Sequence, residues 1–414
     1  MKIIHLNTLD YGGAAIAARR TVEAIRSQGA QAKILVALKR YDNDIFEEVK
    51  NSYLGRKIKW LNISADVGYY LFHARDRSKK FVFSPGQFGI DVSHHPDVIS
   101  ADIIHLHWTY QGFLSLNGIK KLLDLGKPVV WTLHDQWAMT GGCYVQGECQ
   151  KYKAECRNCP LLRPHSQLAL RQQRKKKQIF LSTENLHLIA IARWKKQIIS
   201  QSAIFKNFAQ IKLIPNPINT EFFKPLDKKQ IRQKLGLNNN EIYIGFVAFR
   251  LDDPNKGFKY LAAALNNLAK EKFNKKINLM VIGKTNATIT EKINLPIIFT
   301  GYISDFSIMR DYYNAMDVLV IASLQENLPN TVMEALACGT PVAGFEVGGI
   351  PDMVKHRQNG YLAREKDADD LANGIIDCLE NKEVYGKAAR QHIVQNFSYP
   401  VIGKKLLDFY KSII

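Results

Sequence analysis

The chain alternates short apolar runs with amphipathic segments, a pattern typical of α/β domains with parallel sheets. Strands that are buried on both faces are nearly continuous apolar runs, and here each run leads through a turn into a helical periodicity. The predicted strands are Met1–Asn7, Ala32–Leu38, Ile103–His107, Val129–Leu133 and Leu186–Ala192 in the first half, and Ile242–Val247, Ile277–Gly283, Ile297–Gly301 and Asp317–Ala322 in the second. This repetition predicts two Rossmann-like domains, each built around a parallel sheet.

The stretch Ala322–Val342 carries the best-defined candidate chemistry. An apolar strand leads into a polar loop, and a helix follows that Pro329 can open and Gly339 ends. The free N–H groups of such a helix, at the carboxyl end of a strand, form an anion site. Glu326 lies in the loop and Glu334 in the helix, and the five residues from Pro329 to Glu334 rise about 7.5 Å. We interpret the two carboxylates as groups that bind hydroxyls of one elongated ligand, with a phosphate between them.

The length of 414 residues favours two domains of about 200 residues each. Hydrophobic residues make up 46% and charged residues 23%, which describes a soluble globular protein. No apolar run approaches the ~20 residues that span a bilayer, and the first ten residues, M-K-I-I-H-L-N-T-L-D, turn polar too soon for a secretory signal. We therefore expect a cytoplasmic protein whose first residues form a buried strand.

The net charge of +19 is distributed unevenly. Residues 1–205 hold 30 Lys and Arg against 16 Asp and Glu, a net charge of +14, and the remainder holds 27 against 22, a net charge of +5. This asymmetry indicates an anionic partner for the first half, such as a membrane surface or a lipid phosphate. The densest run, Arg171–Lys177, is either part of a membrane-docking face or a solvated helix face. No nucleic-acid-reading motif is recognisable, so no nucleic-acid partner is expected.

Several motifs together resemble the retaining family 4 glycosyltransferases of the GT-B fold. They are the pair Glu326-x7-Glu334, the segment E-A-L-A-C-G-T-P-V that follows, and the dipeptides Gly348-Gly349 and Asn359-Gly360. The segment W-T-L-H-D-Q-W-A-M-T-G-G-C around residues 131–143 resembles a branch of the family found in bacterial surface-polysaccharide clusters. The resemblance covers nearly the whole chain. It implies an acceptor-binding domain over 1–205, a nucleotide-sugar-binding domain over 206–396 facing it across a cleft, and a helix over 397–414 that crosses back.

The resemblance implies transfer of a hexose from a nucleoside-diphosphate sugar with retention of anomeric configuration. UDP-glucose is the favoured donor, and a growing polysaccharide on a polyprenyl diphosphate is the favoured acceptor. The enzyme would then act in the cytoplasm, peripherally on the inner face of the membrane. The alternatives are a GDP-hexose-dependent transferase, a hydrolase or phosphorylase on the same scaffold, and a non-catalytic subunit that binds sugar or lipid phosphate.

The resemblance also assigns roles to individual residues. Arg250 and Lys256 would neutralise the leaving diphosphate, Glu326 would orient the sugar hydroxyls, Glu334 would bind the ribose, and His134 would contact the donor sugar. The implied catalytic residues are His134, Arg250, Lys256 and Glu326. The implied donor-binding residues are Gly13, Arg250, Lys256, Gly283, Ile303, Glu326, Asn327, Leu328, Pro329, Asn330, Thr331 and Glu334, with Gly12 as a candidate for the acceptor. Asn327-Leu328 departs from the family's usual aromatic or glycine-bearing pair, which bears on sugar specificity.

Metal-dependent glycosyl transfer on another fold needs a D-x-D motif after an apolar strand. Asp42-Asn43-Asp44 and Asp367-Ala368-Asp369 follow charged residues instead, and both are predicted to be solvated loops. No cofactor is therefore expected to be required for catalysis.

Four of the six cysteines, Cys143, Cys149, Cys156 and Cys159, fall within 17 residues, and the last two form a C-x2-C pair. In a cytoplasmic protein such a cluster favours metal over disulfides. A structural zinc ion held by the four thiolates would clamp a loop that is too polar to fold alone. Reduced thiols and disulfides stay open as alternatives, and nothing indicates a catalytic role.

Overall fold

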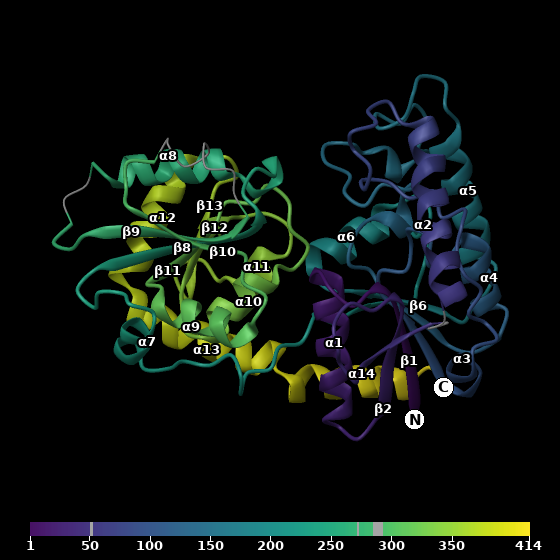
Figure 1. The fold of residues 1–414 in the computed structure, drawn as a ribbon, viewed down its shortest axis with the longest axis horizontal. Helices are drawn as coiled ribbons and strands as arrows, with labels where there is room; N and C mark the ends of the chain where they lie inside the picture. The colour runs from purple at the N-terminus through teal and green to yellow at the C-terminus, as the bar shows by residue number, and fades with distance from the viewer. Residues whose placement is uncertain (50–52, 271–272, 285–292) are drawn as a thin grey trace. The chain divides into compact units, whose positions relative to one another are not determined.

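A computed structural model describes residues 1–49, 53–270, 273–284 and 293–414 (Figure 1). The chain divides into two compact units. Unit 1 comprises Met1–Pro217 together with Ile402–Ile414, and unit 2 comprises Ile218–Val401. The first unit therefore extends beyond residue 205 and recruits the end of the chain, whose last helix returns to it.

Unit 1 is built on a parallel sheet with the strand order β3-β2-β1-β4-β5-β6-β7 among the described residues. The register aligns His5 of β1 with His105 of β4. The strands are β1 (Lys2–Leu9), β2 (Gln31–Leu38), β3 (Phe46–Glu48), β4 (Ile103–Leu106), β5 (Val129–Thr132), β6 (Leu186–Ala190) and β7 (Ile211–Leu213).

Helices cover the sheet of unit 1, and its core gathers aromatic residues such as Trp131, Trp137 and Phe180. The helices are α1 (Gly13–Arg26), α2 (Tyr53–His73), α3 (Pro96–Ser100), α4 (Leu116–Leu123), α5 (Leu168–Phe180), α6 (Arg193–Gln201) and α14 (Tyr399–Lys411), with single 3-10 turns η1 (Trp137–Met139) and η2 (Lys151–Lys153). Helix α14 contributes the buried Tyr410, whose hydroxyl lies 2.6 Å from Nδ1 of His105. The end of the chain thereby completes the core of the first unit.

Unit 2 repeats the plan with the parallel strand order β10-β9-β8-β11-β12-β13. Its strands are β8 (Ile242–Arg250), β9 (Ile277–Lys284), β10 (Ile297–Gly301), β11 (Val318–Ile321), β12 (Val342–Phe345) and β13 (Gly360–Ala363). Its helices are α7 (Lys228–Lys234), η3 (Pro254–Lys256), α8 (Phe258–Leu268), α9 (Phe306–Ala315), α10 (Asn330–Ala337), α11 (Ile350–Met353), α12 (Ala368–Glu380) and α13 (Lys382–Phe397). Both sheets thus reverse their order once, at β1/β4 and at β8/β11, and ligands of such sheets bind beyond the carboxyl ends of the strands at this switch point.

Two local predictions were wrong. Leu186–Ala192 was expected to be the last strand of the first half, but β7 follows it at the sheet edge, where three residues of mixed exposure give little apolar signal. Asp367-Ala368-Asp369 is not a loop, because Asp367 caps α12 by accepting a hydrogen bond from the backbone N–H of Asp370. Asp42 and Asp44 do lie in an exposed turn.

Candidate active site and its relatives

Three loops of unit 2 meet at its switch point, and glycines allow them to touch. Gly257, in the loop after β8, has φ +64°, and a Cβ there would lie 1.9 Å from the carbonyl oxygen of Ala322 in the loop after β11. The same two loops are joined by a hydrogen bond from the N–H of Leu324 to the carbonyl of Asn255, at 2.8 Å. The loop after β8 is therefore fixed against the loop after β11.

The loop after β12 is fastened to the same place by Gly348. Its φ is +57°, and a Cβ would lie 1.7 Å from the carbonyl oxygen of Glu326. The next residue, Gly349, donates its N–H to that carbonyl at 3.3 Å. A side chain at position 348 would both strain the backbone and displace Glu326.

This arrangement brings together two of the predicted site residues. Lys256 Nζ lies 2.6 Å from Oε1 of Glu326, although 70 residues separate them in the chain. Arg250, at the end of β8, is exposed and forms a two-point contact with Asp252 at 2.9 and 2.6 Å. Asp252 holds the guanidinium by these two hydrogen bonds and raises the pKa of Arg250.

Helix α10 starts at Asn330, with Pro329 as its N-cap residue, so Asn327 and Leu328 belong to the loop and Thr331 to the first turn. Pro329 therefore precedes the helix instead of opening its first turn. Glu334 is buried one turn further along and accepts a hydrogen bond from the hydroxyl of Tyr313 at 2.8 Å. Tyr313 could not be identified from the sequence, because its contact depends on how α9 packs against α10.

The ends of β8, β9 and β10 carry the other predicted donor-binding residues of unit 2. A Cβ at Gly283 would lie 1.7 Å from the carbonyl oxygen of Ala248, so this glycine allows β9 to approach β8 closely. Ile303 is half-buried in the loop after β10. Nearby, the exposed rings of Phe249 and Tyr302 pack edge to face, a pair that sequence inspection missed.

In unit 1, the turn after β1 leads into the first turn of α1. Gly12, with φ +89°, is the N-cap residue and Gly13 is the first helical residue. Apart from the adjacent residues and the backbone of the helix itself, no heavy atom would lie within 4 Å of a Cβ at either position. The two glycines therefore leave room above the start of the helix.

A row of stacked histidines lies beneath the carboxyl ends of β1, β4 and β5. His5 Nδ1 is 2.9 Å from His107 Nε2, and His107 Nδ1 is 2.9 Å from Nε2 of the half-buried His134. His105 stacks on both His5 and His107 but bonds to Thr132 and Tyr410 instead. Burial, and secondly the Lys195 ammonium, lowers the pKa of His134 to about 3.

The nitrogens of His5, His105 and His107 lie close enough for a shared metal ion by distance alone. However, both nitrogens of His105 already have hydrogen-bond partners, and His5 and His107 bond to each other. Stacked rings also direct their lone pairs side by side and not toward a common point. We therefore interpret the row as a hydrogen-bonded array. Alternating histidines at positions 105 and 107 of a strand were a sequence signal that went unused.

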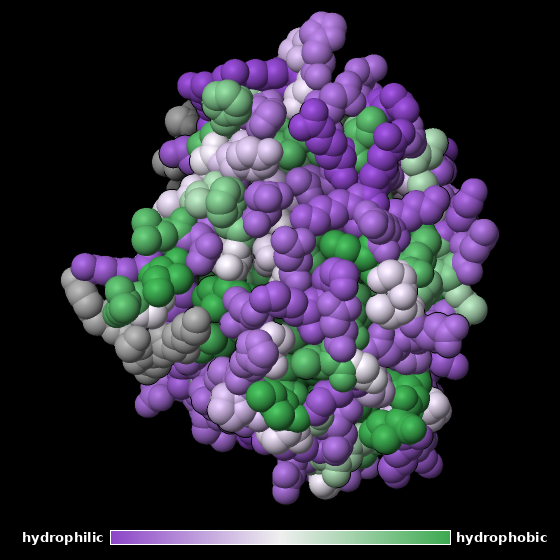
Figure 2. Space-filling model, turned by 90° about the vertical axis from the view of Figure 1, so that its right-hand side faces the viewer, coloured by the Kyte–Doolittle hydropathy of each residue, from purple (hydrophilic) through white to green (hydrophobic). Residues whose placement is uncertain are grey.

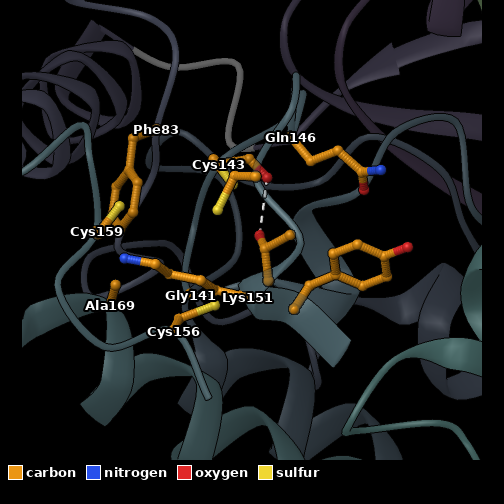
Figure 3. A pocket seen from close by; sticks show the side chains of 11 residues that line it. Phe83, Gly141, Cys143, Gln146, Lys151, Cys156, Cys159 and Ala169 are labelled. Carbon is orange, nitrogen blue, oxygen red and sulfur yellow. Dashed lines mark hydrogen bonds between the residues drawn. The ribbon is translucent and has the colours of Figure 1, made fainter. Parts of the chain in front are cut away.

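The four clustered cysteines line one cavity of about 20 Å³ in unit 1. Figure 3 shows Cys143, Cys156 and Cys159 around this cavity with Phe83 at its edge. All four are free cysteines, which removes the disulfide alternative. Burial raises the pKa of Cys143 to about 12 and that of Cys156 to about 11 in the absence of a bound cation.

The basic run Arg171–Lys177 is only partly a solvated face. Lys176 is fully buried, and its Nζ donates to the carbonyls of Trp137 and Thr140 at 2.6 and 3.1 Å. Arg174 is exposed but pairs with Glu155 at 2.6 Å. Lys195, further along, is also fully buried. These residues therefore do not form one continuous basic surface.

Comparisons with known proteins agree with this architecture. The family model described as Glycosyl transferases group 1 matches residues 241–381. An uncharacterized glycosyltransferase of Methanocaldococcus jannaschii is 25% identical over 97% of this chain and 94% of its own length. The UDP-Gal:alpha-D-GlcNAc-diphosphoundecaprenol alpha-1,3-galactosyltransferase of Escherichia coli is 24% identical over 57% of this chain and 63% of its own.

Among solved structures, Anabaena HepE in complex with UDP covers 100% of both chains with a TM-score of 0.67 and 18% identity. WaaG, a glycosyltransferase involved in lipopolysaccharide biosynthesis, covers 99% of both chains with a TM-score of 0.64 and 16% identity. The fold is thus that of the GT-B glycosyltransferases. The model described as Glycosyltransferase Family 4 matches residues 11–222, or 212 of 414 residues, and the chain belongs to this family of glycosyltransferases.

Proposed function

We propose that this glycosyltransferase moves a hexose, most favourably glucose from UDP-glucose, to a growing polysaccharide on a polyprenyl diphosphate with retention at the anomeric carbon. Support for a UDP-sugar comes from the neighbour HepE, whose structures contain UDP and UDP-glucose. Support for a lipid-linked acceptor comes from the Escherichia coli relative, whose name specifies a diphosphoundecaprenol acceptor. A GDP-hexose remains the alternative donor.

The contact between Lys256 and Glu326 carries this proposal. The two groups neutralise each other at the switch point of unit 2, beside the loop that leads into α10. A nucleoside-diphosphate sugar offers a partner for each of them, because its phosphates attract the ammonium and its sugar hydroxyls donate to the carboxylate. Donor binding would then exchange the internal ion pair for two contacts with the ligand.

The remaining groups complete the division of roles. The N–H groups at the start of α10 and the guanidinium of Arg250 would stabilise charge on the departing diphosphate. Glu334 would bind the ribose, and His134 would donate a hydrogen bond to the donor sugar. The leaving phosphate oxygen would accept the proton of the acceptor hydroxyl while the new glycosidic bond forms on the same face, so the chain needs no nucleophile of its own.

Two glutamine substitutions test the roles of the carboxylates. Glu326→Gln should retain nucleotide binding, because it frees Lys256 for the phosphates, yet it should lower kcat by at least about a hundredfold. Glu334→Gln should weaken nucleotide binding about tenfold or more, since a contact with a charged acceptor is worth ~1.5–3 kcal/mol. Calorimetry with UDP and a transfer assay measure the two effects. The exposed Glu346→Gln is a matched control, and the reverse pattern would refute the assignment.

The donor and the stereochemistry need their own experiment. Thermal-shift measurements with UDP-, GDP- and ADP-sugars should give the largest stabilisation with UDP-glucose. NMR of the product formed on a polyprenyl-diphosphate-linked sugar should show the anomeric configuration of the donor. Stabilisation by GDP-sugars alone would replace the donor assignment, and sugar release that is independent of acceptor would support a hydrolase instead.

A lipid-linked acceptor requires access to a membrane surface. No helix in the described ranges of the chain is long and apolar enough to cross a bilayer. Helix α2 of unit 1, however, exposes Leu54, Ile58, Leu61 and Phe72, which are 38–68% accessible. At 100° per residue these four lie within about 60° of one another on the helix, so they form one apolar stripe. Figure 2, which looks onto the side of unit 1 that carries α2 and α5, shows apolar groups exposed among hydrophilic ones.

Exposed basic residues on α2, beside Phe72 and in the segment after α2 make an anionic bilayer the fitting partner. Arg163 lies 5.9 Å above the ring of Phe72, and Lys57, Lys79 and Lys80 are exposed. Each such charge near an anionic leaflet contributes about 1 kcal/mol, in addition to the burial of the apolar side chains. We therefore propose α2 as the docking face in place of the basic run Arg171–Lys177, in which Lys176 is buried.

Binding to liposomes tests this face. Replacing Ile58 and Leu61 by Ser should abolish sedimentation with phosphatidylglycerol vesicles, whereas Val384→Ser, which changes a 67% exposed apolar residue of unit 2, should not. In the otherwise wild-type protein, the double change Lys79→Glu and Lys80→Glu should weaken vesicle binding and make it less dependent on salt. Equal binding by the α2 variant and the wild type would refute the docking face.

A further inference from the structure

Four cysteines come together in a part of unit 1 that has little regular structure. Between η1 and α5, over residues 140–167, the described backbone holds the single turn η2 and two isolated bridges, at Cys143 and at Leu162. Connections longer than about 12–15 residues without elements of their own are uncommon in compact domains. Cys156 belongs to a small satellite core of buried residues, against which Cys143 and Cys159 pack.

The four thiols line one cavity whose size suits a single small ion. Its volume of about 20 Å³ holds roughly one water-sized sphere. Close packing on either side fixes the wall, since a Cβ at Gly141 would lie 2.4 Å from the carbonyl oxygen of Ala169 and one at Gly142 would lie 2.5 Å from the ring of Phe83. Zinc prefers thiolate donors in a closed tetrahedral site when its role is structural.

A buried cation beside the thiols is the second observation. Lys176 is fully buried, its hydrogen-bond acceptors are two carbonyls, and its Nζ lies 3.5 Å from the centre of the Trp137 ring. Among the described residues no carboxylate forms an ion pair with this ammonium, although buried charges are normally paired. A zinc ion with four thiolates is a net anion and would provide the missing counter-charge.

We propose that Cys143, Cys149, Cys156 and Cys159 bind one Zn²⁺ as a structural tetrathiolate site, with Lys176 as its buried counter-charge. The four thiols release their protons to solvent as the Zn–S bonds form. The cysteines are not among the residues whose ligand atoms already lie within 4.8 Å of one another, so binding draws the sulfurs together and contracts the loop. The zinc ion clamps this loop and takes no part in glycosyl transfer.

Metal content of the full-length protein tests the site. Protein from zinc-supplemented medium, purified without chelator, should contain about one zinc per chain. Cys149→Ser and Cys159→Ser should lose the zinc, while Cys378→Ala, which removes a buried cysteine of unit 2, should keep it. If the serine variants fail to fold, cobalt exchanged into the wild type should show thiolate charge-transfer bands and tetrahedral d–d bands. Metal-free protein with four freely titrating thiols, or iron with acid-labile sulfide, would overturn the proposal, and neither result bears on the transferase assignment.

The histidine row carries a second, independent inference. His5, His107 and His134 form a chain with two hydrogen bonds, each of which needs one N–H donor and one lone pair. Three neutral imidazoles supply three N–H groups, so one proton remains at one end of the chain. Two directions are therefore open, with the remaining proton either on His5 Nε2 or on His134 Nδ1.

The surroundings of His5 decide between the two directions. Its Nε2 is buried and has no hydrogen-bond partner among the described residues. An unsatisfied lone pair is tolerated better in a protein interior than an unsatisfied N–H. His5 therefore donates from Nδ1 to His107 Nε2, His107 donates from Nδ1 to His134 Nε2, and the remaining proton stays on His134 Nδ1.

We infer that His5 and His107 are positioning residues that hold His134 in the Nδ1–H tautomer. The consequence for transfer rests on the proposed function: a hydrogen bond from this ring to the donor sugar comes from Nδ1–H and not from Nε2. The tautomer itself does not depend on that function, because it follows from contacts within unit 1.

Nitrogen-15 NMR of histidine-labelled protein tests the tautomer without any activity measurement. The His134 resonances are assigned by their loss in a His134→Asn sample. In the wild type they should show a protonated Nδ1 and an unprotonated Nε2. His5→Phe should release His107 and give His134 a mixture of tautomers, while the exposed His94→Gln should change nothing. A protonated Nε2 in the wild type, or an unchanged tautomer in a folded His5→Phe protein, would overturn the inference. If His5→Phe does not fold, the wild-type spectrum decides alone.

Discussion

Lowering the pH from 6.5 to 4.5 is expected to destabilise unit 1 through its buried histidines. Burial lowers the pKa of His5 to about 3 and holds the pKa values of His105 and His107 well below 6.5. In the unfolded chain these groups titrate near 6.5, so the unfolded state takes up protons in this window that the folded unit does not. Wherever the unfolded state binds more protons than the folded state, stability decreases as the pH is lowered.

The magnitude follows from the number of buried groups. Burial also lowers the pKa of His134 to about 3, so four histidines stay neutral in the folded unit. Each costs about 2 kcal/mol of stability across these two pH units, and the four together cost ~9 kcal/mol. Asp66 acts in the opposite sense: burial raises its pKa to about 6, so the folded unit binds that proton first. Protonation of this carboxyl in the folded unit offsets about 2 kcal/mol of that loss of stability. Burial also raises the pKa of Asp135, with the same sign. Before the contribution of Asp135, the net loss is about 7 kcal/mol, a large part of the ~5–15 kcal/mol that stabilises a domain.

Intrinsic fluorescence isolates unit 1 in this measurement. All five tryptophans belong to that unit and none to unit 2; they are Trp60, Trp108, Trp131, Trp137 and Trp194. Urea unfolding followed by tryptophan fluorescence should show a midpoint that falls steadily from pH 6.5 to 4.5. Circular dichroism, to which unit 2 also contributes, separates the second transition. A fluorescence midpoint that is independent of pH over this range would refute the assignment of neutral, buried histidines.

Three substitutions test single contacts. Gly348→Ala should weaken UDP binding tenfold or more in calorimetry, because its Cβ collides with the carbonyl of Glu326. Gly236→Ala, with a similar φ but open surroundings after α7, is the control. Tyr313→Phe leaves an oxygen of the buried carboxylate in α10 without that donor and should cost ~1–3 kcal/mol in urea unfolding of unit 2. Tyr410→Phe should destabilise unit 1 by a similar amount, seen as a lower fluorescence midpoint; an unchanged midpoint in either tyrosine variant would contradict the corresponding contact.

The sequence predicted most strands because buried parallel strands are nearly continuous apolar runs. Ile242–Val247, for example, is contained in β8, and Val129–Leu133 matches β5 to within one residue. The short edge strand β7 escaped notice, because its Lys212 and Leu213 are exposed and interrupt the pattern.

The candidate site was only partly accessible to the same reasoning. Glu326 and Lys256 were identified by their motifs, but their contact depends on β11 lying next to β8, which strand order and not local sequence determines. For the same reason the role of Tyr313 was not foreseen. The buried state of Lys176 was hidden within a run of charges, since composition alone does not distinguish a snorkelling lysine from a fully enclosed one.

The return of α14 to unit 1 has a consequence for the order in which the protein is made. The ribosome delivers β1 to β7 long before Tyr410, so His105 emerges without the hydroxyl that later bonds to its Nδ1. Gly403, whose missing side chain lets α14 approach the carbonyl of Ala24, is likewise synthesised only after all of unit 2. Unit 2 can fold first as an uninterrupted stretch, whereas unit 1 reaches its final packing only after the whole of unit 2 has been synthesised. A released chain truncated after Val401 should therefore show a protease-resistant unit 2 beside a loosely packed unit 1.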